Sequence, residues 1–103
     1  FFHYGEEVVP TLKYLLKAMI LPTVTVDMGA VKFVVNGADI MRPGIVDIGT
    51  FDSGEFIVII DVNNKMPLAV GIANMDSSEM ESVSSGKVVK NIHYVGDEIW
   101  KFA

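Results

Sequence analysis

The 103-residue sequence contains no cysteine, and this absence excludes several kinds of chemistry at once. Disulfide bonds, thiolate nucleophiles and cysteine-ligated zinc are all ruled out. Histidine is scarce as well, because His3 and His93 are the only two and lie far apart in the sequence. Neither belongs to a paired spacing of the kind that holds a metal ion. We therefore predict no metal centre.

Long hydrophobic runs are also missing, although 50% of the residues are hydrophobic. The densest run extends from Phe56 to Ile60, and Asp61 ends it. A membrane-spanning helix needs about 20 apolar residues, so we predict no membrane segment. The run is instead typical of a β-strand that is buried on both faces.

Recognisable catalytic and phosphate-binding patterns are absent too, since the sequence has no Walker A loop and no GxGxxG pattern. Residues 61–65 superficially begin a calcium loop, but Met66 stands where glycine is needed and Ile72 where a bidentate glutamate belongs. Adjacent acids such as Asp97 and Glu98 lie on opposite sides of a strand, so they form no acid–base pair. We predict no enzymatic activity and no cofactor.

Positive charge is in short supply, with 8 basic against 13 acidic residues and a net charge of −5. Most of the acidic residues lie beyond Val46, whereas the span from Val31 to Val46 holds Lys32 and Arg42 against Asp39 alone. If the protein has an RNA-binding surface, we expect it in this span. The overall charge argues against tight binding that depends on electrostatics alone.

The first 21 residues read as the end of another folded unit. Pro10 suits the first turn of a helix, and four apolar residues follow it with helical spacing: Leu12, Leu15, Leu16 and Met19. Pro22 then ends this helix. The segment is too small to fold alone, and the sequence opens on Phe1-Phe2 without a methionine. We expect a domain fragment, with 1–21 as a strand end and a helix.

The remaining sequence predicts short strands with few helices. Asp27 to Gly37 is ambiguous, because its β-branched residues favour a strand while a possible Asp27 cap and an Asn36-Gly37 end favour a helix. Asp76 to Glu79 resembles a capping box, which indicates a second helix. The predicted strands are Thr23 to Val26, Phe56 to Val62, Pro67 to Ala73, Lys87 to Tyr94 and Ile99 to Phe102, with a turn at Arg42-Pro43-Gly44. This composition predicts a mainly β protein with short helices, arranged as a small barrel.

The segment from Val26 to Ile45 carries a specific motif. It reads V-D-x-G-A-hydrophobic-K and then N-G-A-x-hydrophobic-x-x-P-G. This motif resembles the opening of a PUA domain, and the later elements follow in the order of that family, so the resemblance covers Pro22 to Trp100. It implies a PUA-type pseudobarrel over residues 22–103, and it implies that the ambiguous segment is a helix from Gly29 to Asn36.

Within PUA proteins, the chain is most similar to the malignant-T-cell-amplified-sequence family and its archaeal relatives. The resemblance rests on Phe1-Phe2, Pro10-Thr11-Leu12 and Leu21-Pro22, and on Asn91 to Tyr94 with Trp100. It implies that 1–21 is the C-terminal, helical remnant of a largely absent pre-PUA domain. Eukaryotic members act on the small ribosomal subunit with a partner protein in initiation, reinitiation and recycling.

The same resemblance points to a candidate RNA-binding surface. In PUA proteins the segment from the first helix into the next strand faces RNA, and the last strands extend that surface. Each candidate has a plain structural alternative: the glycines supply backbone conformations, Asn36 caps a helix, and the cations are ordinary surface charge. If the last long strand is regular, Lys90 and His93 point in opposite directions, so at most one contacts a ligand. The candidates are Gly29, Lys32, Asn36, Gly37, Ala38, Arg42, Pro43, Gly44, Lys90 and His93, whereas Phe33, Val34, Phe56, Ile57, Ile59 and Met75 are expected in the core.

The sequence leaves three functions open. The first is a non-catalytic RNA-binding module of a cytoplasmic, ribosome- or tRNA-associated translation factor, with a tRNA acceptor end or ribosomal RNA as partner. The second is a protein-interaction module, which the acidic balance favours. The third is the accessory RNA-binding domain of an RNA-modifying enzyme, since PUA domains also occur in such enzymes.

Overall fold

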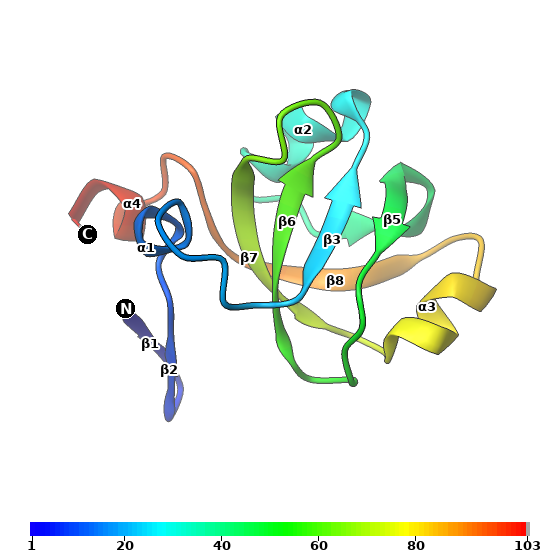
Figure 1. Ribbon diagram of the computed structural model, residues 1–103, viewed down its shortest axis with the longest axis horizontal. Helices are drawn as coiled ribbons and strands as arrows, with labels where there is room; N and C mark the ends of the chain where they lie inside the picture. The colour runs from blue at the N-terminus through cyan, green and yellow to red at the C-terminus, as the bar shows by residue number, and fades with distance from the viewer. Residues whose placement is uncertain (103) are drawn as a thin grey trace.

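The computed structural model describes residues 1–102, apart from the side chain of Phe102. Short strands dominate it, as the sequence predicts, and the helices are all of one or two turns (Figure 1). In chain order the elements are β1 (Phe2–Tyr4), β2 (Glu7–Val9), α1 (Leu12–Leu15), β3 (Thr23–Val26), α2 (Met28–Val34), β4 (Ile40–Met41), a 3₁₀ turn (Arg42–Gly44), β5 (Ile45–Ile48), β6 (Phe56–Asp61), β7 (Pro67–Ala73), α3 (Ser77–Ser82), β8 (Lys87–Tyr94) and α4 (Glu98–Phe102).

Six of the strands form one sheet in the order β4-β8-β7-β6-β3-β5. All neighbouring pairs are antiparallel except β3 and β6, which run parallel. The two edge strands, β4 and β5, are consecutive in the chain and joined only by the Arg42–Gly44 turn. This short connection brings the edges together, so the sheet curls into a nearly closed barrel.

Strand β6 lies at the centre of the protein, and both of its faces are buried. Ile57 and Ile59 point into the main core inside the barrel, together with Val24, Val26 and Val89. A second apolar cluster lies on the outer face of the same strand, built around Val58, Ile60, Val70, Val9, Leu12 and Leu15. The two-faced burial predicted for the Phe56 to Ile60 run is confirmed.

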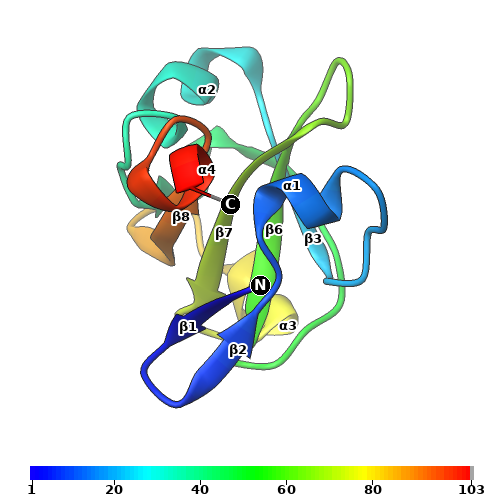
Figure 2. The ribbon, with the colours of Figure 1, turned by 90° about the vertical axis from the view of Figure 1, so that its left-hand side faces the viewer.

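The second cluster attaches the N-terminal segment to the outside of the barrel. Strands β1 and β2 form a separate antiparallel hairpin, with Phe2 opposite Val9, and α1 follows directly. Figure 2 shows the hairpin and α1 lying in front of β6 and β7. The predicted long helix is wrong: α1 is a single turn capped by Thr11, and the predicted apolar residues Leu16 and Met19 are exposed.

The predicted last strand is also wrong, because Glu98–Phe102 forms helix α4. The carboxylate of Asp97 explains the difference. Its Oδ1 accepts a hydrogen bond of 2.7 Å from the Trp100 N–H, which is the contact of a helix N-cap. The strand propensity of Ile99 and Trp100 is weak by comparison with this cap and the burial of Trp100 against the second cluster.

Two other helix caps were readable from the sequence. Asp27 begins α2, where its Oδ1 accepts the Ala30 N–H at 2.9 Å, and Asp76 begins α3 in the same way with Glu79. The ambiguous segment is therefore helical, as the family resemblance implied. Within residues 1–102, no helix is long and apolar enough to span a membrane.

Candidate nucleic-acid interface

A groove of about 740 Å³ lies beside helix α2. It is bounded by α2 on one side and by the chain from Ala38 to Gly44 on the other, with the start of β8 closing one end. Its lining residues are mainly small or apolar: Asp27, Gly29, Ala30, Phe33, Val34, Ala38, Asp39, Ile40, Met41, Pro43, Gly44 and Lys87. The volume falls in the usual range for ligand sites, about 300–1,000 Å³.

Hydrogen bonds to backbone carbonyls fix both walls of the groove. The Asp27 N–H donates to the Gly44 carbonyl at 2.9 Å, which ties the start of α2 to the 3₁₀ turn. At the other end, the Asn91 side-chain amide donates to the carbonyls of Val34 and Ala38, both at 3.0 Å. Strand β8 thus holds the last turn of α2 in place, and the groove is preformed by the fold.

Phe33 is the most prominent side chain at this groove. The sequence predicted it as a core residue, and this prediction is wrong, because 58% of its surface is exposed. Helix α2 buries Val34 and partly buries Ala30, Val31 and Val35, so Phe33 falls on the opposite, solvent-facing side. Its ring is a free aromatic surface on which a flat group can stack.

The charges at the groove nearly cancel one another. Lys87 lies at one end, and its Nζ is 3.7 Å from Oδ2 of Asp39. The other oxygen of Asp39 accepts the Asn91 N–H at 2.9 Å, and the Asp27 carboxylate is occupied as a helix cap. Lys32 adds a cation at the rim, with its Nζ 5.2 Å from the centre of the Phe33 ring. The groove is therefore apolar, and the positive and negative charges at its rim nearly cancel, so it is not strongly basic.

Four of the ten candidates from the sequence line the groove: Gly29, Ala38, Pro43 and Gly44. Lys32 on α2 and Asn36 in the turn after it are both exposed, and the Asn36 amide donates to the Lys32 carbonyl at 2.7 Å. Gly37 has a structural role, since its φ of +90° favours glycine and a Cβ there would lie 2.9 Å from the Tyr94 ring.

Arg42 holds the fold together with the donors we expected it to offer a phosphate. Its Nε donates to the Met80 carbonyl at 2.8 Å, and its Nη1 donates to the Ile45 carbonyl at 3.3 Å. The first bond connects the 3₁₀ turn to helix α3, and the second is local to the turn and the start of β5. Two of the guanidinium's donors are thus used within the protein, and its contact with RNA stays a prediction.

His93 lies outside the candidate surface because it is completely buried. Its Nε2 accepts the Leu12 N–H at 3.1 Å, and its Nδ1 lies 2.8 Å from Oδ2 of Asp97. Only the tautomer with its proton on Nδ1 makes both hydrogen bonds. Burial alone would raise the pKa of Asp97, but hydrogen bonds from the Trp100 N–H, the His93 ring and the Tyr94 N–H outweigh it and lower the pKa.

Lys90 also points away from the groove, toward the N-terminal hairpin. Its Nζ lies 5.8 Å from the centre of the Tyr4 ring, and the Tyr4 side chain raises the pKa of Lys90. Sequence reasoning missed three groove residues with functional character: Phe33, Met41 and Lys87. Phe33 and Met41 lie within the glycine-rich motif, but only the structure shows which way they face, and nothing in the sequence places the distant Lys87 beside them.

The nearly closed barrel and the preformed groove beside α2 define a compact, mainly β domain. Within residues 1–102, no group of three or more acidic or histidine side chains is placed to hold a metal ion. Residues 22–95 match the model of the PUA domain, and the chain belongs to the PUA domain family.

Its relatives include proteins from archaea and eukaryotes. It is 50% identical to an uncharacterized protein of Methanocaldococcus jannaschii, over 98% of this chain and 64% of the relative. It is 38% identical to translation machinery-associated protein 20 of Saccharomyces cerevisiae, over 100% of this chain and 61% of that protein. It is 40% identical to human malignant T-cell-amplified sequence 2, over 88% and 53% of the two chains. The chain thus spans between half and two thirds of the length of these relatives.

Two solved structures illustrate the fold match. A hypothetical protein of Pyrococcus horikoshii superposes with a TM-score of 0.85 at 35% identity, over 97% of this chain and 65% of that one. A chain in the crystal structure of an archaeal box H/ACA sRNP complex superposes with a TM-score of 0.71 at 28% identity, over 79% and 26%. The PUA fold therefore recurs both in small proteins and within larger assemblies.

Proposed function

We propose that this chain is the RNA-binding module of a cytoplasmic translation factor that associates with the ribosome or with tRNA and catalyses no reaction. The observation that carries the proposal is the exposed Phe33 ring beside the small, preformed groove of α2. Unpaired RNA bases are commonly recognised by stacking on such aromatic rings. Membership of the PUA family and relatives named for the translation machinery support this proposal.

The groove suits an unpaired end of RNA, such as a tRNA acceptor end, or an unpaired segment of ribosomal RNA. Gly29 is exposed, so a ribose or phosphate can approach the backbone at the α2 wall, whereas Gly44 packs close to the Ala30 side chain and keeps the opposite wall in place. The apolar floor and balanced charges leave little for a duplex to bind. Stacking and backbone contacts then supply the affinity, which is consistent with the acidic composition.

The test is the substitution Phe33→Ala, measured by fluorescence anisotropy with a short single-stranded RNA. Losing one stacked base costs about 1–3 kcal/mol, which corresponds to a loss of affinity between about fivefold and about 150-fold. Because Phe33 is exposed, the free energy of unfolding changes little. Val8→Ala is the control, since Val8 is also an exposed apolar residue and lies on the N-terminal hairpin. Equal affinities of the two variants would argue against the groove as the RNA site.

For residues 1–21, we propose that they belong to the end of a preceding domain, with the PUA domain covering 22–103. The supporting observation is a set of exposed apolar side chains in this segment: Phe1, Val8, Leu16, Met19 and Ile20. Exposed apolar side chains gathered in this way commonly mark a surface that another domain or protein covers. In a longer form of the protein, the amide hydrogens of Val8 and Ile20 should exchange more slowly than in this chain. Unchanged exchange would contradict this assignment.

A further inference from the structure

The two ends of the chain meet on the opposite side of the barrel from helix α3. Figures 1 and 2 both show α1 and α4 side by side, outside β7 and β8. The buried His93 connects them, because it accepts the Leu12 N–H of α1 and contacts Asp97, which caps α4. The junction is thus a fixed part of the fold.

This junction gathers positive charge in an otherwise acidic protein. Lys13 and Lys17 are four residues apart on α1 and its continuing turn, where the Ala18 N–H still donates to the Tyr14 carbonyl at 3.0 Å. They therefore share one side of the turn. Lys101 lies on α4. No acidic residue occurs between Glu7 and Asp27, so nothing in that stretch offsets the lysines.

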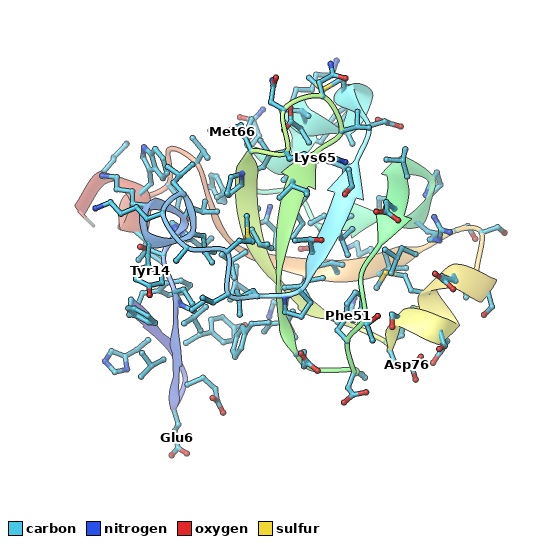
Figure 3. The ribbon with its side chains drawn as sticks, in the orientation of Figure 1. Glu6, Tyr14, Phe51, Lys65, Met66 and Asp76 are labelled. Atoms are coloured by element: carbon cyan, nitrogen blue, oxygen red, sulfur yellow. The ribbon has the colours of Figure 1, made fainter. Side chains whose placement is uncertain are left out.

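The acidic residues closest in sequence do little to neutralise this charge. The Asp97 carboxylate points inward, where it accepts hydrogen bonds from two backbone N–H groups. Glu98 remains as one exposed acid on α4. Within residues 1–102, none of Lys13, Lys17 and Lys101 lies within 4.0 Å of a carboxylate oxygen. Helix α3, with Asp76 and Glu79, lies at the far end of the molecule (Figure 3).

Aromatic rings stand among these lysines. Nζ of Lys13 lies 5.2 Å from the centre of the Trp100 ring, and the Phe1 and Tyr14 rings are 4.9 Å apart on the same segment. Cations interleaved with aromatic rings are the typical composition of a surface that follows a nucleic-acid backbone. We propose that the α1–α4 face, defined as Lys13, Lys17, Trp100 and Lys101, binds the phosphate backbone of RNA as a second contact surface.

This second surface rests on the proposed function, because it extends the path of an RNA held in the groove. The end of α2 touches the end of β8, where Gly37 lies against the Tyr94 ring. The chain then passes directly from Tyr94 into the Asp97 cap and α4. RNA that leaves the groove past Gly37 therefore reaches the lysines of the α1–α4 face. The charges favour an RNA that places its unpaired end in the groove and its phosphate backbone on the lysines.

Two RNA probes separate the surfaces in experiments on the 103-residue chain. The first is a short single-stranded oligonucleotide, which occupies the groove alone. The second is a hairpin with the same oligonucleotide as its 3′ overhang, which reaches both surfaces. Trp100 is the only tryptophan in the sequence, so its fluorescence reports directly on the α1–α4 face. We expect the hairpin, but not the oligonucleotide, to change this fluorescence.

The variants Lys17→Gln and Lys101→Gln test the charges, with Lys65→Gln as the matched control. Lys65 is an exposed lysine on the β6–β7 turn, away from α1 and α4 (Figure 3). Each test variant should weaken hairpin binding about fourfold near physiological salt and lower the salt slope by about one. The double variant should lower it by about two, and oligonucleotide binding should not change. Far-ultraviolet circular dichroism verifies that each variant is folded.

Failure of the α1–α4 face and failure of the groove assignment give different results. If Lys65→Gln weakens hairpin binding as much as Lys17→Gln does, the weaker binding reflects the net charge of the protein, and the proposal that the α1–α4 face binds RNA is overturned. A hairpin that binds without changing Trp100 fluorescence overturns it too. The proposal is also overturned if a polyglutamate peptide changes this fluorescence and the hairpin does not, since the partner of the face would then be an acidic protein. If only the groove assignment is wrong, Phe33→Ala leaves oligonucleotide binding unchanged while the lysine effects persist.

Discussion

The buried imidazole of His93 offers the sharpest test of how the N-terminal segment is held. In His93→Phe the ring volume is nearly kept, but both of its hydrogen bonds are lost. The Leu12 N–H then has no acceptor in a buried position, which costs about 1–3 kcal/mol. Asp97 loses a third partner but keeps its two backbone donors, which adds about 1 kcal/mol. We expect His93→Phe to lower the free energy of unfolding by about 2–4 kcal/mol.

Urea titration measures this loss, and hydrogen exchange locates it. The Leu12 amide should exchange much faster in His93→Phe than in the parent chain, whereas amides of β6 should change only with global stability. His3→Phe is the matched control, because His3 is exposed on the hairpin. His93→Ala should cost about 2 kcal/mol more than His93→Phe, since it also leaves a cavity. A loss below about 0.5 kcal/mol for His93→Phe would refute the idea that this imidazole joins α1 to the barrel.

Three further predictions follow from single contacts. Gly37→Ala should destabilise the protein by about 2–3 kcal/mol in thermal or urea unfolding, because it combines a positive φ with contact on the Tyr94 ring; a neutral effect would contradict the close approach. Arg42→Ala should cost about 1.5–3 kcal/mol, since it leaves the Met80 carbonyl without its donor, while oligonucleotide affinity measured on the folded fraction should change less than twofold. Folding lowers the pKa of the Asp97 carboxyl below its ordinary 3.8, so the ionised carboxylate stabilises the folded protein above this pH. This stabilisation is lost as the pH falls through the folded pKa, and Asp97→Asn should abolish it at every pH. Unfolding measured across the acid range should therefore show the parent and Asp97→Asn converging at low pH.

Local signals in the sequence were sufficient wherever a short-range contact decides the structure. Asp27 and Asp76 begin helices because each carboxylate reaches an N–H three residues ahead, and this pattern is visible in the sequence. The Phe56 to Ile60 run could be identified as a doubly buried strand from its unbroken apolar character. Glu98–Phe102 shows the limit of such reasoning. Its residues favour a strand, and the helix depends on an Asp97 carboxylate positioned partly by a histidine from the preceding strand.

For the candidate site, the sequence located the segment but not the direction of its side chains. The sequence pointed to the segment from Gly29 to Gly44, and both glycines line one groove, while their contact with RNA stays a prediction. Phe33, predicted in the core, is exposed, and the Arg42 guanidinium donates to two backbone carbonyls that the sequence did not indicate. Five of the seven residues of α2 are apolar, so the sequence shows no single apolar side that must face the core. The bond from Arg42 to the Met80 carbonyl joins residues 38 positions apart, and no local pattern encodes it.

The charge distribution bears on how the two proposed surfaces would select an RNA. A net charge of −5 repels nucleic acid from most of the surface, so an RNA gains nothing by binding at random. Under the two proposals, an RNA overcomes that repulsion only when it offers an unpaired end to the Phe33 groove and a phosphate backbone to the α1–α4 face. Each interaction alone is weak, but two linked contacts raise the effective concentration of the second and bind together. Affinity should then depend on how far the unpaired end lies from the helical stem, because an overhang of the wrong length separates the two contacts. A hairpin series that varies only the overhang should show a maximum, and a flat series would mean that one surface alone binds.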